Sequence, residues 1–219
     1  MGTRDRLAWY SLQGEATDFA VEHGLSAADW YRTDIPRKRM KELMRRSDAP
    51  AIRDTIIWLG LILLSGAGII VTWGSWWVLP FALVYGVLYG SAGDSRWHEA
   101  GHGTAFRTRW MDQAVYQIAC FFMMRNPVTW RYSHARHHSD TLVVGRDPEI
   151  VAMRPARLGR ILLNLVGLVD VPQAIATMLR LSAGRLSGDE RDYVPTEERA
   201  AAVRIARIWL AIYAAVIAL

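Results

Sequence analysis

Histidine is the residue type in this sequence whose spacing most clearly suggests chemistry. Five of the six histidines fall into two groups, the first made of His98 and His102, the second of His134, His137 and His138. Side chains three or four residues apart lie on one face of an α-helix, so each group can present its imidazoles together. Neutral imidazole binds iron, zinc, copper and nickel. The spacing predicts a metal site built from these five side chains, whereas the isolated His23 is interpreted as a surface or capping residue.

The first histidine group also permits a different metal chemistry. The segment His98-Glu99-Ala100-Gly101-His102 matches the H-E-x-x-H pattern of zinc metalloproteases, in which Glu99 would be the general base acting on zinc-bound water. A catalytic zinc normally takes three protein ligands, and five histidines exceed that number, whereas a two-metal site can use them all. A membrane zinc protease therefore stays open as the alternative to a two-metal centre.

A long apolar stretch precedes the first histidine group. No Asp, Glu, Lys, Arg or His occurs in the 39 residues 55–93. As a helix this stretch would measure about 60 Å, roughly two crossings of the hydrocarbon core of a bilayer. Because Trp73-Gly74-Ser75 is typical of a turn at a membrane–water interface, we expect spans at residues 55–72 and 76–92 that form a helical hairpin. An ordinary soluble globule is excluded, and the single cysteine, Cys120, excludes a disulfide scaffold.

The positive charges flank this apolar stretch. The net charge is +5, six of the ten residues 37–46 are Lys or Arg, and 16 arginines lie between Arg96 and Arg207. Cytoplasmic segments of membrane proteins carry such an excess, so both ends of the hairpin and the histidine groups are expected to face the cytoplasm, and nucleic-acid binding is disfavoured. No signal peptide is visible, and residues 1–54 are predicted to be a cytoplasmic lead-in with a basic juxtamembrane helix. A capping-box pattern at residues 26–29 predicts a further short helix.

Three other segments are apolar. Residues 111–124 are too few to span a bilayer and predict an interfacial helix. Residues 161–179 have an Asp and a Pro in their middle, and we expect an amphipathic helix along the inner surface. Residues 208–219 are wholly apolar and are interpreted as the start of a third span. The predicted fold class is therefore an all-α membrane protein: a transmembrane helical hairpin plus interfacial helices and the start of a third span, with residues 55–219 as the membrane domain.

The two histidine groups, following a membrane hairpin, resemble the first two histidine boxes of the membrane fatty-acid desaturase and hydroxylase superfamily. The most specific part is His134-Ala135-Arg136-His137-His138-Ser139-Asp140-Thr141, followed by Gly145-Arg146-Asp147-Pro148-Glu149, and the likeness covers about residues 55–219. The family carries a third box of the form H/Q-x-x-H-H, which has no counterpart after His138 in this sequence. We therefore expect the C-terminal part of the family domain to be absent, and the 219-residue chain alone to be inactive or nearly so.

The resemblance implies two irons with five histidine ligands, namely His98, His102, His134, His137 and His138. It also suggests three carboxylates that would orient the imidazoles, namely Glu99, Asp140 and Asp147. The implied function is that of an O2-dependent oxidoreductase of the bacterial-type inner membrane, which acts on a lipid or fatty-acyl substrate by desaturation or hydroxylation. A small electron-transfer protein of the ferredoxin or cytochrome type is the implied electron donor.

Overall fold

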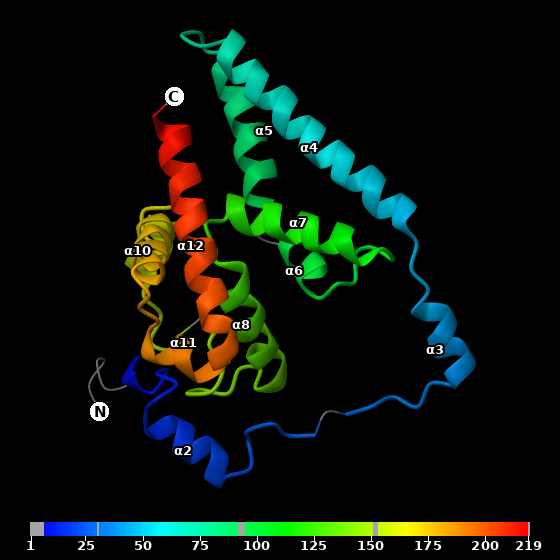
Figure 1. Cartoon of the computed structure of the whole chain (residues 1–219), viewed down its shortest axis with the longest axis vertical. Helices are drawn as coiled ribbons and strands as arrows, with labels where there is room; N and C mark the ends of the chain where they lie inside the picture. Colours follow the sequence, from blue (N-terminus) through cyan, green and yellow to red (C-terminus); the bar gives the residue numbers. More distant parts are fainter. Residues whose placement is uncertain (1–6, 30, 92–94, 151–152, 219) are drawn as a thin grey trace. The chain divides into compact units, whose positions relative to one another are not determined.

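The computed structural model describes residues 7–29, 31–91, 95–150 and 153–218. Within these ranges the structure contains α-helices and no β-strand, which confirms the predicted all-α class (Figure 1). The chain divides into two compact units. Residues 33–123 form the first, here called the hairpin unit, and residues 1–32 together with 124–219 form the second, here called the terminal unit. Each unit is described by itself.

The described residues of the hairpin unit form five helices, α3 (Arg37–Leu43), α4 (Asp48–Val71), α5 (Val78–Gly90), α6 (Ser95–Gly101) and α7 (Arg109–Phe122). Helices α4 and α5 run antiparallel and pack against each other, which confirms the predicted helical hairpin (Figure 1). The turn between them exposes Trp73, Trp76 and Trp77, as expected of an interfacial aromatic cluster. Helix α3 confirms the predicted helix in the basic segment.

The first helix of the hairpin begins earlier than predicted, at Asp48 instead of residue 55. The Asp48 carboxylate accepts hydrogen bonds from the backbone N–H groups of Arg107 (2.7 Å) and Thr108 (2.9 Å) and from the Thr108 hydroxyl (2.7 Å). These bonds tie the first turn of α4 to the start of α7. The stretch Arg37–Val71, which contains α4, is long and apolar enough to cross a membrane, whereas α5 is a shorter apolar helix.

The core of the hairpin unit joins the hairpin to α7. Trp58 and Ile62 of α4 pack with Ala119 of α7, and all three are buried. The Trp58 indole N–H donates to the Leu88 carbonyl (2.9 Å), and the Trp58 ring lies against Phe122 with a centroid separation of 5.8 Å. Helix α7 in turn packs on α6, so this core also positions the helix that carries the first histidine group. Helix α7 confirms the helix predicted at residues 111–124.

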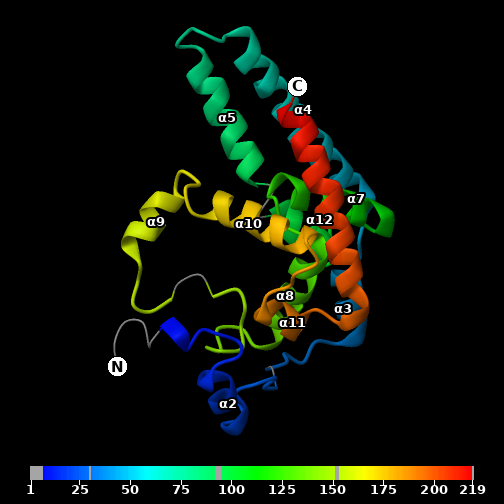
Figure 2. The same cartoon turned by 60° about the vertical axis from the view of Figure 1, so that its left-hand side comes forward.

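The terminal unit contains six described helices, α2 (Glu15–Glu22), α8 (Pro127–Ser139), α9 (Leu158–Asn164), α10 (Asp170–Ser182), α11 (Gly188–Tyr193) and α12 (Thr196–Ile217). Helix α12 packs against α10 and α8, and α11 also contacts α8 (Figure 2). Ala202 and Ala206 of α12 are fully buried, and such small side chains let helices approach closely.

Helix α12 corrects the prediction of a third span that starts at residue 208. The helix begins at Thr196, and its 22 residues are long and apolar enough to cross a membrane. The sequence pattern hid its first half because Arg199, Arg204 and Arg207 interrupt the apolar run. A helix tolerates these residues where one face carries the charges and another face buries alanine.

The prediction of a single helix over residues 161–179 is wrong, because the structure breaks this segment between α9 and α10. Gly167 has φ +74°, and the N–H groups of Gly167 and Leu168 donate to the carbonyls of Asn164 and Leu163, which closes α9 with a Schellman motif. The Asn164 side chain then accepts from the Asp170 N–H at 2.9 Å, where α10 begins. Pro172 lies in the first turn of α10, where its missing N–H costs no helical hydrogen bond.

The short helix predicted from the capping-box pattern at residues 26–29 is also wrong. Residues 26 and 27 form a turn, and Ala27 has φ +50°. The Ala27 N–H donates to the Asp140 carboxylate at 2.8 Å. The Ser26 N–H, from which the Asp29 side chain would accept in a capping box, instead donates to the Ala20 carbonyl at 3.3 Å.

Close packing in the hairpin provides the first testable prediction. A methyl group added at Gly68 of α4 would overlap the Phe81 ring of α5, whereas one added at Gly60 meets no atom within 4 Å. We expect Gly68→Ala to destabilise the purified protein by about 1–3 kcal/mol, the usual cost of overpacking. Thermal unfolding in detergent micelles, followed by circular dichroism, measures the effect.

The matched control is Gly60→Ala, which should leave the midpoint unchanged or raise it because alanine favours helix. The double variant Gly68→Ala/Phe81→Ala should recover part of the loss by making room for the methyl group. Equal midpoints for Gly60→Ala and Gly68→Ala would show that α4 and α5 do not pack as described.

Candidate metal centre

The first histidine group lies at the end of α6. His98 is on the helix, and His102 follows its last residue with its N–H donating to the His98 carbonyl at 3.1 Å. Gly103, at φ +65°, ends the helix: its N–H donates to the Ala100 carbonyl (3.0 Å), and the Thr104 N–H donates to the Glu99 carbonyl (3.1 Å). This is a Schellman motif, which needs a residue that tolerates positive φ at the position of Gly103.

The two imidazoles of this group face each other through their Nε2 atoms. The His98 Nε2 and His102 Nε2 atoms are 3.3 Å apart, and both side chains are exposed. Ala100, on another face of the same helix, is completely buried. Burial of Ala100 thus sets the rotation of α6 and leaves the imidazole pair accessible.

The second histidine group lies on α8, whose start is held by a buried asparagine. The Asn126 side-chain oxygen accepts from the N–H groups of Val128 (3.1 Å) and Thr129 (3.3 Å), and its amide nitrogen donates to the Ala202 carbonyl of α12 (2.8 Å). Pro127 occupies the first helical position, which favours helix initiation. Asn126 therefore fixes where α8 begins and anchors that helix on α12.

His134 is the buried member of the second group. Its ring stacks on Trp130, one helical turn earlier, with centroids 4.4 Å apart and planes at 15°. Its Nε2 atom is 3.1 Å from the Nε2 atom of His138, and these two rings are perpendicular. The helical spacing predicted for both histidine groups is confirmed, whereas metal binding by them stays a prediction.

Two carboxylates orient the imidazoles of α8. Asp147 accepts from His137 Nδ1 at 2.9 Å, which agrees with the orienting role suggested for it. Glu149 Oε2 lies 2.8 Å from His134 Nδ1, and Glu149 Oε1 accepts from the Ser133 hydroxyl at 2.7 Å. With Nδ1 donating to a carboxylate, a neutral imidazole keeps its lone pair on Nε2, the atom able to bind metal.

Sequence reasoning did not assign a role to Glu149. The available signal was the alternation Asp147-Pro148-Glu149 shortly after α8. The structure adds that the Glu149 N–H donates to Asp147 Oδ1 at 2.8 Å, so the two carboxylates belong to one hydrogen-bonded turn. The Leu142 N–H also donates to Asp147, at 2.8 Å.

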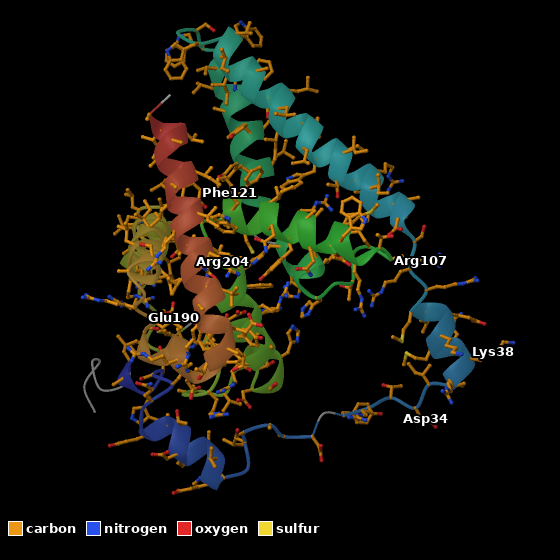
Figure 3. All side chains as sticks on the ribbon, in the orientation of Figure 1. Asp34, Lys38, Arg107, Phe121, Glu190 and Arg204 are labelled. Atoms are coloured by element: carbon orange, nitrogen blue, oxygen red, sulfur yellow. The ribbon has the colours of Figure 1, made fainter. Side chains whose placement is uncertain are left out.

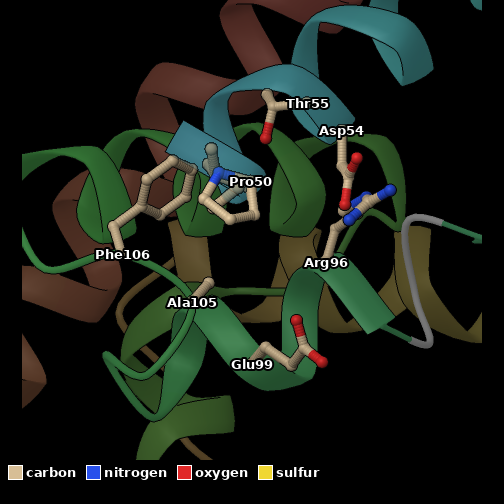
Figure 4. Close-up of a pocket in the computed structure, with 9 residues that line it drawn as sticks. Pro50, Asp54, Thr55, Arg96, Glu99, Ala105 and Phe106 are labelled. Carbon is tan, nitrogen blue, oxygen red and sulfur yellow. The ribbon is translucent and has the colours of Figure 1, made fainter. Parts of the chain in front are cut away.

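The other two suggested carboxylates have different surroundings. Asp140 is buried and accepts from the Ala27 N–H and from Arg146 Nε (3.1 Å), so it holds the loop after α8 instead of orienting an imidazole. Glu99 lines a cavity of about 180 Å³ in the hairpin unit together with Asp54 and Arg96 (Figure 4).

The loop that carries Asp147 and Glu149 packs on α2. Gly145 has φ +81°, and a Cβ there would lie 2.7 Å from the Thr17 backbone nitrogen and 2.8 Å from Ala16. The Thr17 hydroxyl donates to the Gly145 carbonyl at 2.6 Å. Glycine is required at this contact by both its conformation and its space, and α2 thereby supports the two carboxylates.

The imidazole pairs have the geometry of metal ligands. Two nitrogens bound to one ion at about 2.1 Å are separated by about 3.0 Å at a right angle and by about 3.4 Å at a tetrahedral angle. The separations of 3.3 Å in His98–His102 and 3.1 Å in His134–His138 lie between these limits. The same distances also suit a hydrogen bond between two rings when only one carries the proton. Each pair therefore fits two ligands of a single transition-metal ion.

Comparison with known proteins identifies the family. The sequence model of the fatty acid desaturase family matches residues 74–219. An endoplasmic-reticulum omega-6 fatty acid desaturase of Brassica juncea is 30% identical over 100 residues, 44% of this chain and 24% of the relative. A delta(12)-fatty-acid desaturase of Arabidopsis thaliana is 34% identical over 73 residues, 32% of this chain and 19% of the relative.

The matched region thus spans about a quarter or less of the length of these relatives. No solved structure matches the chain. The family match covers both histidine groups and α5, the second helix of the hairpin, and it extends through α12. The chain, a membrane protein whose described residues include two helical stretches able to cross a bilayer, belongs to the fatty acid desaturase family.

Proposed function

We propose that this chain supplies five histidine ligands to the two-iron centre of an oxidoreductase that introduces a double bond into a fatty-acyl chain. The proposed ligands are His98, His102, His134, His137 and His138. The observation that carries the proposal is the pairing of Nε2 atoms at 3.1 and 3.3 Å, with carboxylates on the opposite ring nitrogens of α8. Family membership supports iron and an acyl substrate for this donor set.

When bound, iron supplies the O2-dependent chemistry: two hydrogens leave adjacent carbons, and O2, two electrons and two protons complete the formation of two waters. The chain's own residues orient the imidazoles and hold them in place. Asp147 and Glu149 keep the protons of His137 and His134 on Nδ1, so both imidazoles present Nε2. Trp130 covers one face of His134, whose side chain is only 6% exposed, and thereby shields it from water.

We further propose the surroundings of this centre. The excess of arginine outside the apolar helices favours a metal site on the cytoplasmic side of a bacterial-type inner membrane. The apolar, outward-facing helices α4, α5 and α12 suit a lipid-like substrate delivered from the bilayer. Electrons would come from a small ferredoxin- or cytochrome-type protein. Hydroxylation is the variant reaction in which oxygen is transferred to the same acyl carbon.

The zinc-protease alternative has less support. It uses only His98, Glu99 and His102 and gives no role to the carboxylate-bound histidines of α8. The family match favours the oxidoreductase. The experiments below distinguish the two functions by metal identity and by the effect of Glu99→Gln.

Metal analysis tests the proposed ligands. We expect the protein, produced in iron-supplemented cells and purified in detergent, to retain iron, and His102→Ala and His137→Ala to weaken iron binding by more than about 10-fold, since each removes a donor. Inductively coupled plasma mass spectrometry and chelator competition measure metal identity and affinity. The matched control is His23→Ala, which removes an exposed histidine whose Nδ1 faces the Phe19 carbonyl.

Retention of zinc instead of iron, with peptide cleavage that Glu99→Gln abolishes, would establish the protease. Iron content that is equal in His102→Ala, His137→Ala and His23→Ala would exclude the proposed ligands.

The Glu149 contact generates a separate prediction. Glu149→Gln keeps the side-chain shape but removes the charge that stabilises the Nδ1 proton of His134, so iron affinity should fall about 10- to 100-fold. Chelator competition at constant pH measures the change. Asp192→Asn is the control. Asp192 is exposed and pairs with Arg136 of helix α8 at an N–O distance of 3.0 Å, and this pair does not involve the imidazoles. Equal affinities in the two variants would contradict the orienting role of Glu149.

Turnover should be weak in the 219-residue chain. Five imidazoles supply two irons with between two and three protein donors each, fewer than a stable centre needs. We expect oxygen-dependent conversion of deuterated acyl lipids, followed by mass spectrometry with an added ferredoxin and its reductase, to stay near background. Two tightly bound irons together with rapid loss of deuterium would contradict this expectation.

A further inference from the structure

Four arginines surround an open cavity in the terminal unit, apart from the histidines. The cavity has a volume of about 670 Å³, and its lining includes Arg180, Arg185, Leu186, Arg191, Arg199 and Val203. It is formed by the end of α10, the loop that follows, α11 and the first half of α12. Figure 3 labels Glu190 of α11 and Arg204 of α12 in this part of the unit.

One of the four positive charges is neutralised within the protein. Arg180 forms a two-pronged ion pair with the Glu190 carboxylate, with N–O distances of 2.5 and 2.8 Å. The Ser187 N–H also donates to Glu190 at 2.7 Å. Both oxygens of this buried carboxylate are therefore engaged, and it is committed to Arg180.

Two other arginines are held in place without being neutralised. Arg191 donates from Nε and Nη2 to the Leu186 carbonyl, at 3.2 and 2.9 Å. Arg199 donates to the carbonyls of Val194 (3.2 Å) and Arg191 (2.7 Å). A carbonyl carries no net charge, so these bonds orient the guanidinium groups and leave their positive charge for a ligand. Arg185 is exposed, and within the described residues these three arginines of the lining form no ion pair.

The cavity also borders an apolar surface. Leu186 and Val203 contribute to its lining. Along α12 the face of Val203 continues at helical spacing through Arg207 to the apolar residues Leu210 and Ala214. No charged residue follows Arg207 in the sequence, and α12 is long and apolar enough to cross a membrane. The arginines therefore end where the apolar part of α12 begins, which is the level of lipid headgroups for a spanning helix.

We propose that this cavity binds the phosphate group of an anionic phospholipid. Arginine donates paired N–H groups that match phosphate oxygens, and guanidinium groups already held by carbonyls lose little freedom on binding. The acyl chains would lie along the apolar face of α12. A concave site with an apolar border suits an amphiphile better than the surface of an acidic protein. The proposal uses no metal ligand and does not depend on the proposed oxidoreductase function.

Lipid binding by the full chain tests the proposal. The protein is purified in a neutral detergent, and the affinity of fluorescent phosphatidylglycerol is compared with that of fluorescent phosphatidylcholine. We expect phosphatidylglycerol to bind more tightly, and Arg185→Gln to weaken it about fivefold, the effect of one arginine near an anionic lipid surface. Arg199→Lys keeps the charge but loses the paired donors, and it should also weaken binding.

Arg157→Gln is the matched control, since it removes an exposed arginine at the start of α9 in the same unit. It should leave the affinity unchanged, and circular dichroism should show equal helix content in all variants. Equal affinity of the two lipids, or equal loss in Arg157→Gln and Arg185→Gln, would overturn the proposal.

Two further probes separate other sources of negative charge. Inorganic phosphate at low millimolar concentration should not displace phosphatidylglycerol, because phosphate lacks the acyl chains. Complete displacement would identify a site for free phosphate and overturn the lipid proposal. The proposal would also be wrong if Arg185→Gln kept phosphatidylglycerol binding but lost binding of a polyglutamate peptide, since the surface would then dock an acidic protein.

Discussion

Hydrogen bonds between carboxylates and imidazoles are the constraint on which the candidate centre depends. Asp147 binds Nδ1 of His137, and Glu149 binds Nδ1 of His134. An imidazole without such a partner can rotate and can carry its proton on either nitrogen. Each carboxylate removes this freedom by stabilising one tautomer, so that Nε2 becomes the donor atom. The arrangement explains why an acidic turn follows a helix that carries three histidines.

That acidic turn is itself held by distant parts of the chain. Asp140 binds the Ala27 N–H, and Gly145 packs against Thr17 and Ala16 of α2. The N-terminal segment therefore belongs to the same compact unit as α8, although residues 33–123 separate them in the sequence. The division into a lead-in of residues 1–54 and a membrane domain of residues 55–219 stays a prediction, but α2 has a structural role beyond that of a leader.

The hairpin unit orders its histidines by a different means. The Schellman motif around Gly103 sets the end of α6, and burial of Ala100 sets the rotation of that helix. Behind α6, α7 connects to the hairpin through Trp58, Ile62 and Ala119. Packing of an apolar core thus orients one imidazole pair, whereas charged hydrogen bonds orient the other group.

The family and the helical hairpin could be predicted because both depend on features local in the sequence. The 39 uncharged residues 55–93 require apolar surroundings wherever they lie, and imidazoles three or four residues apart share a face of any helix. The histidine spacing and the residues that follow α8 were sufficient to suggest the desaturase family, which the match over residues 74–219 confirms.

Other features were decided by contacts between residues far apart. The break before α10 depends on the positive φ of Gly167 and on the bond from Asn164 to Asp170, and the early start of α12 depends on burial of Ala202 against neighbouring helices. Likewise, Glu149 and Asp140 are similar acids in one loop, yet one binds His134 and the other binds Ala27. The sequence by itself determined which residue types could bind metal and which segments had to be apolar, because composition and helical period are properties of the chain. Only the tertiary structure decided which carboxylate meets which imidazole, because a hydrogen bond forms over about 3 Å between groups that folding alone brings together.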